Sequence, residues 1–156
     1  MSRILPIITN PNPLLRKKSA EISQKQISSK KIQELCLNMA ETMIKKDGAG
    51  LAAPQTGKNI RLIMVNTKDG TVCMINPKIT RKSLLKEWGE EGCLSIPETY
   101  GQVKRYKKIN CQYLNKNGKG AKITAEGLLA RIIQHEIDHL NGILFIDKAK
   151  KIHIDN

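Results

Sequence analysis

Two of the three histidines in this 156-residue chain lie four positions apart, in His135-Glu136-Ile137-Asp138-His139. On a helix, residues four apart lie on one face, so both imidazoles can bind one metal ion. Glu136 follows the first histidine and projects beside that ion, where it can take a proton from a water molecule. The alternative is a helix with two ordinary histidines, which would be costly to bury without partners on an otherwise apolar stripe.

A catalytic metal needs three protein ligands and one open coordination position. His153 lies near the end of the chain and is a poor third ligand. Cys93 is a better one, because it lies in the turn Glu91-Gly92-Cys93-Leu94-Ser95, where glycine allows a close backbone approach. A lone cysteine in a turn is more often structural, and only the pairing with the histidine helix favours Cys93 as a ligand. The other cysteines are predicted to be small core residues: Cys36, Cys73 and Cys111.

A third motif, Gly48-Ala49-Gly50-Leu51-Ala52-Ala53-Pro54-Gln55, consists mainly of small residues that expose the backbone. Its simplest interpretation is a helix end followed by a loop. It lacks the Lys-Ser/Thr pair of a phosphate-binding loop and the spacing G-x-G-x-x-G, so the sequence argues against nucleotide binding.

Together and in this order, G-x-G-x-A-A-x-Q, E-G-C-L-S and Q-H-E-x-D-H resemble the three-motif signature of the peptide deformylases. Two further segments are similar to the family: the opening Asn10-Pro11-Asn12-Pro13-Leu14-Leu15, and Gly101-x-Val103-x-Arg105 after the cysteine. The resemblance runs from about Ile4 to Phe145. The joint match is highly specific, whereas each motif alone is moderate or weak.

The resemblance implies that Cys93, His135 and His139 hold one divalent metal ion, with the fourth position left for water. Iron(II) is the ion implied, although a mixed nitrogen and sulfur ligand set also accepts zinc, nickel or cobalt. Glu136 would act as general base and then as general acid. The Gln55 amide and the Leu94 backbone N–H would stabilise the oxyanion.

The implied substrate is the N-terminal formyl-methionine of a nascent polypeptide, which the enzyme hydrolyses to release formate. Gly50 would offer its backbone to the peptide, which lies extended like an added strand. Arg105 and Asp138 would pair and fix the helix against the metal loop. Three residues are candidates for the methionine pocket, with plain core packing as the alternative: Ala49, Leu128 and Ile132.

Hydrophobic periodicity predicts the elements that position these residues. Apolar residues at helical spacing predict an N-terminal helix from Ser29 to Lys46, and a second helix from about Ala125 to Leu140 is apolar on two sides and therefore buried. Strand patterns lie between them, at residues 61–65, 71–75, 79–85, 109–113 and 121–124. The expected fold is α+β, with antiparallel sheets around a buried C-terminal helix that carries H-E-x-x-H.

Length and composition predict one catalytic domain over residues 1–156, with no membrane-spanning segment and a cytoplasmic location, or an organellar one in a eukaryote. The formal net charge of +13 favours transient contact with ribosomal RNA through a basic surface, although solvated excess lysine is the simpler interpretation. With 3% aromatic residues, base stacking and sequence-specific nucleic-acid binding are not expected. The tail after Gly142 is shorter than the C-terminal helix that touches the ribosome in many bacterial relatives.

Two rival functions remain open. A zinc endopeptidase with the same H-E-x-x-H would cleave internal peptide bonds and would not need Cys93. A non-enzymatic ribosome-associated protein would carry a closed four-ligand structural metal, and Glu136 would have no effect on it.

Overall fold

The computed structural model describes residues 2–155. Its α-helices are α1 (Gln24–Ile27), α2 (Lys30–Lys45) and α3 (Leu128–Leu140), and three 3₁₀ turns span Pro13–Arg16, Ala53–Thr56 and Phe145–Asp147. The strands are β1 (Gly50–Ala52), β2 (Leu62–Thr67), β3 (Gly70–Lys82), β4 (Lys86–Cys93), β5 (Ile96–Tyr106), β6 (Lys108–Leu114), β7 (Gly120–Glu126) and β8 (Lys150–Ile154).

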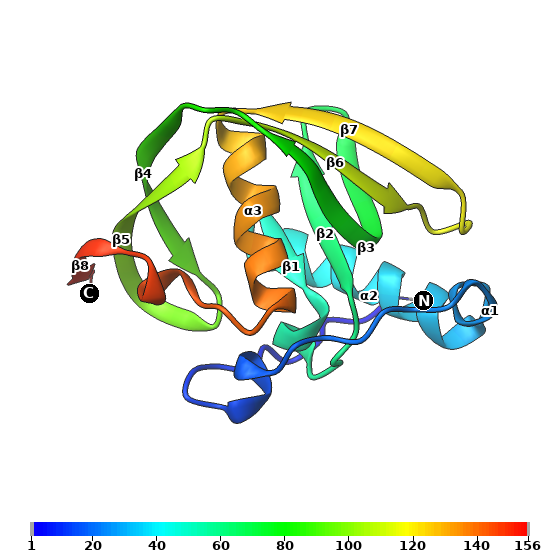
Figure 1. Ribbon diagram of the computed structural model, residues 1–156. Coiled ribbons are helices and arrows are strands. Elements are labelled where there is room, and N and C mark those ends of the chain that lie inside the picture. The colour runs from blue at the N-terminus through cyan, green and yellow to red at the C-terminus, as the bar shows by residue number, and fades with distance from the viewer. Residues whose placement is uncertain (1, 156) are drawn as a thin grey trace.

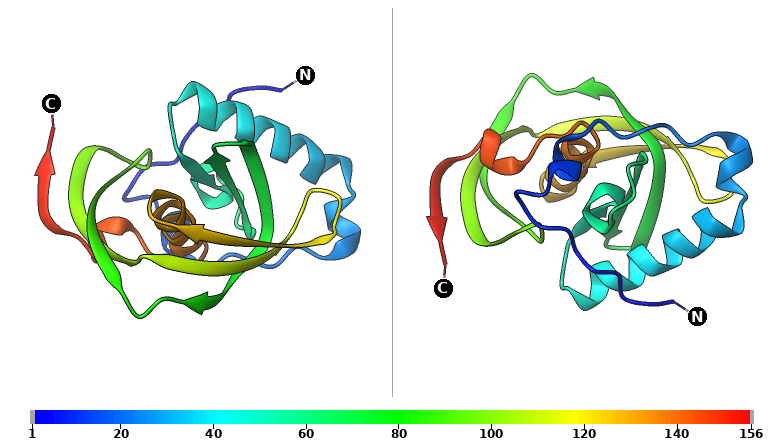
Figure 2. Two further views of the ribbon diagram at one scale, coloured as in Figure 1. Left: turned by 90° about the horizontal axis from the view of Figure 1, so that it is seen from above. Right: turned by 90° about the horizontal axis from the view of Figure 1, so that it is seen from below.

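The strands form two antiparallel sheets on either side of α3 (Figures 1 and 2). The larger sheet has the order β1-β2-β3-β6-β7, and the smaller has the order β4-β5-β8. The expected α+β fold, with antiparallel sheets around a C-terminal helix, is therefore confirmed. Strands β1 and β4 are edge strands, and each carries one of the motifs found in the sequence.

Helix α2 begins where the sequence predicts, because the Ser29 hydroxyl accepts a hydrogen bond from the Ile32 N–H and caps the helix. Its apolar residues pack on one face of the larger sheet, while α3 packs on the opposite face. The α2 layer includes Ile32, Leu35, Met39, Met43, Leu62 and Met64. The α3 layer includes Ile63, Val65, Met74, Ile109, Ala130, Ile133 and Ile137. The core thus consists of two layers with the sheet between them.

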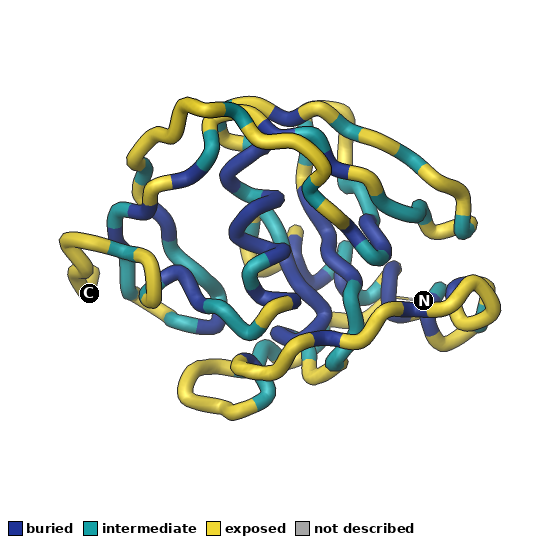
Figure 3. The backbone as a smooth tube through the Cα atoms, in the orientation of Figure 1, coloured by how far each residue is buried: buried dark blue, intermediate teal, exposed yellow. Residues whose placement is uncertain are grey.

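Helix α3 is buried along most of its length, as its two apolar stripes predict. Figure 3 shows it as the most continuously buried helix at the centre of the molecule. Among its buried residues are an arginine, a glutamine, two histidines and a glutamate. Charged groups at such depth need partners, and these come from the smaller sheet.

The predicted start of this helix at Ala125 was wrong. Strand β7 continues to Glu126, and Gly127, with a φ of 65°, turns the chain before α3 begins at Leu128. Ala125 is apolar because it is buried in the strand. Its position in the sequence also fits the apolar periodicity of the helix, which explains the error. Helix propensity does not separate these alternatives, because tertiary packing decides the boundary.

The sequence patterns missed β1, β4 and β5 and the final strand β8. The interval 50–52, expected to be a loop, pairs with β2 through the register Gly50↔Val65. Strands β4 and β5 pair over most of their length although both contain glycines and charged residues that hide the alternation. The segment 150–154 pairs with β5. No helix among the described residues is long and apolar enough to cross a bilayer.

Candidate metal centre and active site

The structure brings Cys93, His135 and His139 together between the two sheets. One ligand atom from each lies within 4.8 Å of the others. Cys93 ends β4, and its Sγ lies 3.3 Å from Nε2 of His139. Both histidines project from the same side of α3, with ring centroids 5.0 Å apart. His153, which the sequence made a poor ligand, lies on the exposed strand β8 and instead pairs with Glu90 of β4.

A thiol and two imidazoles at this spacing fit a divalent metal ion. Tetrahedral sites with bonds of about 2.0–2.3 Å bring their ligand atoms to within a few ångströms of one another. The other ring nitrogen of His135, Nδ1, lies 2.8 Å from Glu91 Oε1, which leaves Nε2 free for the cluster. Burial lowers the pKa of His139 well below its usual value and keeps its imidazole neutral, whereas hydrogen bonds with Cys93 and Glu91 raise the pKa of His135 to about 10 against the effect of burial. A metal ion bound to His135 would displace the proton from its Nε2. The side chains present are therefore consistent with a divalent ion.

Glu91 organises the charges behind the ligands and was missed as a functional residue. Its carboxylate accepts hydrogen bonds from Arg105 at 2.9 Å and from Arg131 at 2.8 Å, and it contacts His135. Burial alone would raise the pKa of Glu91, but the hydrogen bonds with Arg105 and His135 outweigh it and hold the pKa well below its usual value. Glu91 is therefore charged at neutral pH, and it fixes the orientation of one ligand.

Arg105 also pairs with Asp138, as the resemblance implied, and Lys148 reaches the same carboxylate at 3.0 Å. Arg105 is 4% exposed, and Arg131 donates a further hydrogen bond to the Val103 carbonyl at 2.8 Å. The network joins β5 to β4 and α3, and these last two elements carry the three candidate ligands. Each charge in this network has an opposite partner, which a low-dielectric interior requires.

Glu136 lies beside the ligands and faces the backbone of β1. It is 4% exposed, and its Oε2 has no hydrogen-bond partner among the described residues. Burial raises the pKa of Glu136 to about 7. A Cβ at Gly50 would lie 2.7 Å from Glu136 Oε1, so glycine is required at this approach. The carboxylate is thus held where it can exchange a proton with a group in the cavity.

Gln55 presents its amide to the same space. The Ala52 N–H donates to Gln55 Oε1 at 2.9 Å. This hydrogen bond orients the amide so that its Nε2 faces Cys93 and Ser95. Gln55 Nε2 then lies 3.0 Å from the Ser95 hydroxyl oxygen and 3.4 Å from Cys93 Sγ. Ser95 is fully buried and was not recognised as a functional residue, although it lies within the cysteine motif. The amide donor is therefore positioned before any substrate arrives.

A cavity of about 600 Å³ opens onto these groups. Gly50, Gln55, Cys93, Leu94, His135 and Glu136 line it, as do the predicted pocket residues Ala49, Leu128 and Ile132. Ala49 is exposed, and Leu128 is 71% exposed, so both lie at the rim. Arg105 and Asp138 do not line this cavity, because they lie behind the ligands. A buried His-Cys-Glu cluster at the base of an open cavity is an arrangement suited to metal-assisted hydrolysis.

Comparison with known proteins gives one family. A family model described as Polypeptide deformylase matches residues 4–154. A peptide deformylase of Desulfotalea psychrophila is 45% identical over 155 residues, covering 96% of this chain and 89% of the relative. One of Halothermothrix orenii is 46% identical over 151 residues, covering 96% of each chain.

Solved structures agree with the sequence comparison. A Met-Ala-Ser-bound class I type b peptide deformylase of Acinetobacter baumannii superposes with a TM-score of 0.90 at 37% identity, covering 95% of this chain and 99% of the other. The peptide deformylase of Thermotoga maritima gives 0.91 at 37% identity, with coverage of 95% and 99%. The activity is removal of the N-formyl group from nascent polypeptides. The chain therefore belongs to the peptide deformylase family.

Proposed function

We propose that Cys93, His135 and His139 hold a single Fe²⁺ ion in the working enzyme, and that Zn²⁺, Ni²⁺ or Co²⁺ can replace it. The convergence of one thiol and two imidazoles within 4.8 Å is the observation that carries this proposal. Imidazole suits all four metals and thiolate tolerates them, so the ligand set supports the exchange. The open cavity in front of the cluster favours a catalytic ion over a closed structural one.

A divalent ion held there supplies Lewis acidity that activates water for attack on the formyl carbon. Glu136 accepts the proton of the attacking water and delivers it to the leaving amine nitrogen. Its unpartnered Oε2 and its position against Gly50 support both proton transfers. Formate and a free amino terminus result, which balances the hydrolysis of one amide bond.

The developing oxyanion lies against two donors of this chain, the Gln55 amide and the Leu94 backbone N–H. The fixed orientation of Gln55, through its contacts with Ala52 and Ser95, supports the first. The two-residue turn between the ends of β4 and β5 supports the second, because it brings Leu94 to the cavity wall beside Cys93. Donors already aimed at the site of charge need no reorganisation during the reaction.

We infer that formyl-methionyl peptides bind as an added strand between β1 and β4. Both are edge strands whose residues line the cavity, and Gly50 leaves backbone exposed at this edge. Ala49, Leu128 and Ile132 would then contact the methionine side chain at the cavity rim. The related structure bound to Met-Ala-Ser supports a peptide of this length and chemistry. Arg105 and Asp138 serve as positioning residues, because they hold α3 against β5.

We further propose that one catalytic domain spans residues 1–156 and works in the cytoplasm, or in an organelle of a eukaryote. The family match over residues 4–154 supports the first part, and a substrate that emerges from ribosomes supports the second. Neither membrane nor sequence-specific nucleic acid is a partner in this proposal.

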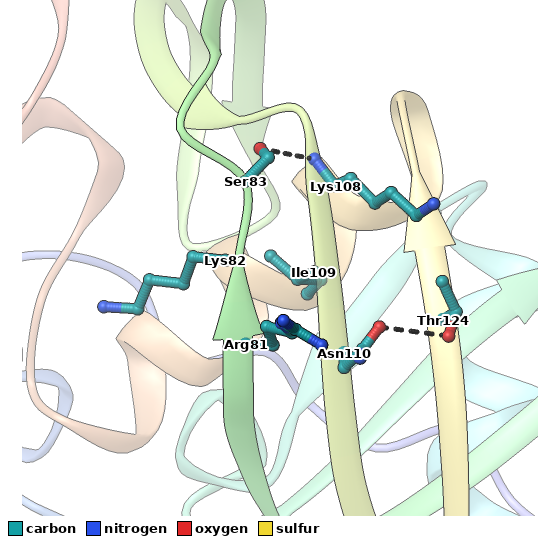
Figure 4. A pocket seen from close by; sticks show the side chains of 7 residues that line it. All are labelled: Arg81, Lys82, Ser83, Lys108, Ile109, Asn110 and Thr124. Atoms are coloured by element: carbon teal, nitrogen blue, oxygen red, sulfur yellow. Dashed lines mark hydrogen bonds between the residues drawn. The ribbon is translucent and has the colours of Figure 1, made fainter.

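Transient ribosome contact is proposed through the outer face of β3, β6 and β7. A hollow of about 400 Å³ there is lined by Arg81, Lys82 and Lys108, by neutral residues and by no acidic residue (Figure 4). Farther along the same sheet, Gln112 of β6 pairs with Lys78 of β3 on one side and with Lys122 of β7 on the other, which adds two lysines to this surface. Phosphate contacts of this kind weaken steeply with salt. Salt-resistant co-sedimentation with ribosomes that disappears when the chain ends at Asp147 would contradict this proposal.

The deformylase activity is tested by formate release from formyl-Met-Ala-Ser after anaerobic purification, with acetyl-Met-Ala-Ser as control. We expect release from the formyl peptide only, and no cleavage of internal bonds. Cys93→Ala should lose both metal and activity, while Cys111→Ala, a buried thiol in β6, should keep both. Cleavage of internal bonds without a need for Cys93 would favour a zinc endopeptidase, and a metal-loaded protein inactive on either peptide would favour a structural metal.

A further inference from the structure

We propose that Cys36 and Cys73 are an oxidisable dithiol that closes into an intramolecular disulfide when the protein meets a peroxide, cross-linking α2 to β3. The two Sγ atoms lie 3.4 Å apart, in contact but unbonded, although the residues are 37 positions apart in the chain. Neither residue lines the catalytic cavity.

The surroundings of the two sulfurs are suited to this reaction. Cys36 is 5% exposed in the apolar layer beneath α2, and Cys73 is only partly buried against the same layer, which gives a small oxidant access to the pair. The side chain of Gln33 donates to the Lys116 carbonyl at 2.8 Å and holds the β6–β7 turn beside α2. This contact keeps a lysine close to the two thiols.

The two thiols differ in acidity. The hydrogen bond with Cys73 lowers the pKa of Cys36 against the opposing effect of burial, and the charge of Lys116 lowers it further. The same hydrogen bond and burial raise the pKa of Cys73. Cys36 is therefore the better nucleophile, and Cys73 is the thiol that resolves the first product.

The chemistry balances with a hydroperoxide as the oxidant. The Cys36 thiolate attacks the peroxide oxygen, breaks the O–O bond and becomes a sulfenic acid while hydroxide leaves. The Cys73 thiol then attacks that sulfur, forms the S–S bond and releases water. Two thiols lose two electrons and two protons in total, and hydrogen peroxide is reduced to two molecules of water.

Closure requires the sulfurs to approach from 3.4 Å to about 2.0 Å, which small side-chain rotations on α2 and β3 can supply. The bond would fix the middle of α2 to the larger sheet. Because a cross-link between residues 36 and 73 restricts the unfolded chain, we expect the oxidised protein to keep its fold and to unfold at a higher temperature.

Cys111 provides an internal control. It is fully buried, its Sγ donates to the Gln112 carbonyl oxygen at 3.7 Å, and burial raises its pKa to about 11. It should stay reduced under conditions that oxidise the pair. This proposal does not depend on the deformylase reaction, and it is tested through thiol chemistry alone.

The test treats nickel-loaded protein with a small excess of hydrogen peroxide, alkylates the remaining thiols after denaturation and digests the chain with trypsin. We expect the peptide of residues 32–45 to be joined to that of residues 69–78, and reduction to separate them. Cys111 should be fully alkylated, and Cys111→Ala should form the same cross-link. Cys73→Ala should form none.

Two results would overturn the proposal. In the first, Cys36 and Cys73 are both recovered alkylated under conditions that oxidise Cys93. In the second, they form only sulfinic or sulfonic acids, or cross-links between two copies of the chain. The mapping of the unsubstituted protein decides the question even where a cysteine variant fails to fold.

Discussion

The two sides of α3 meet different kinds of surface. One side presents Ala130, Ile133 and Ile137 to the apolar face of the larger sheet. The other side presents charged and ligating groups to the β4–β5 hairpin, where Arg131 and His135 both contact Glu91. Apolar packing is non-directional and tolerates replacements of similar volume, whereas each buried charge needs one particular partner. Substitutions on the polar side should therefore lower the rate of formate release. Substitutions on either side should lower the free energy of unfolding.

The sharpest test of the polar side is Glu136→Gln, which keeps the size of the side chain and removes its ability to accept a proton. We expect formate release to fall by about 10²–10⁴-fold, the usual contribution of general acid–base catalysis. Metal content measured by elemental analysis should be unchanged, because Glu136 is not part of the ligand cluster.

Glu126→Gln is the matched control, because this glutamate ends β7 and is exposed. It should leave turnover unchanged. Near-normal turnover in Glu136→Gln would mean that Glu136 is not the group that transfers the proton. Loss of its metal would mean that Glu136 acts on the metal site instead.

The second test removes the charge that holds the polar side together. Glu91→Gln leaves Arg131 buried without its carboxylate partner and leaves Arg105 with Asp138 alone. Breaking a buried ion pair in this way costs about 3–5 kcal/mol of unfolding free energy. Metal affinity should fall by about 10–100-fold, because His135 loses the charged acceptor that orients its ring.

Chemical denaturation and competition with a chelator measure these two effects. Glu90→Gln is the control at the adjacent position, where the side chain is 55% exposed and pairs with exposed His153. Equal effects at the two positions would remove the distinction between a buried network and ordinary surface charge.

Substitutions on the apolar side of α3 should lower the free energy of unfolding and leave the turnover per metal ion unchanged. Ile133→Ala, at a position with no exposed surface, should cost about 2–5 kcal/mol of unfolding free energy through lost packing and a residual cavity. The surviving folded protein should keep its turnover per metal ion. Leu37→Ala, 59% exposed on α2, should change stability little. A large fall in turnover per metal ion in Ile133→Ala would show that the two sides of α3 are coupled.

The same contrast explains what the sequence could predict. The candidate ligands His135 and His139 could be found because helical spacing is local. Cys93 could be chosen because it lies in a glycine-containing turn and the histidine helix lacked a third ligand, and the resemblance then agreed. The α+β class and helix α2 followed from apolar periodicity and a serine cap. These signals lie within single segments of the chain, and no knowledge of distant contacts is needed to read them.

Strands β4 and β5 could not be found in this way, because contacts with α3 determine their residue types. A Cβ at Gly89 would lie 2.7 Å from Arg131, so a glycine interrupts the strand pattern where the arginine passes. Glu91 resembled an ordinary surface acid, since its partner Arg131 is 40 residues away and His135 is 44 residues away. The motif E-G-C-L-S contained the signal, but only the fold shows what the glutamate binds.

The smallest effect is expected at the surface, where Arg16 and Asp147 join two 3₁₀ turns. Their side chains are 44% and 37% exposed, so solvent screens the pair, and Asp147→Asn should cost about 0.2–1 kcal/mol. The hydrogen bond from Arg16, followed by that from the Leu144 N–H, lowers the pKa of Asp147 against the effect of burial. The contribution is therefore present above the pKa of the unfolded chain and disappears as pH falls through the lower folded value.

Thermal midpoints of the unsubstituted protein and Asp147→Asn should accordingly differ slightly near neutral pH and converge in acid. High salt should also reduce the difference, because it screens exposed charges. Glu34→Gln removes the looser pair with Lys30, which is 3.8 Å long and more exposed, and should change the midpoint less. A difference that persists in acid would mean that Asp147 stabilises the turn through its neutral hydrogen bond with Leu144, and not through its charge.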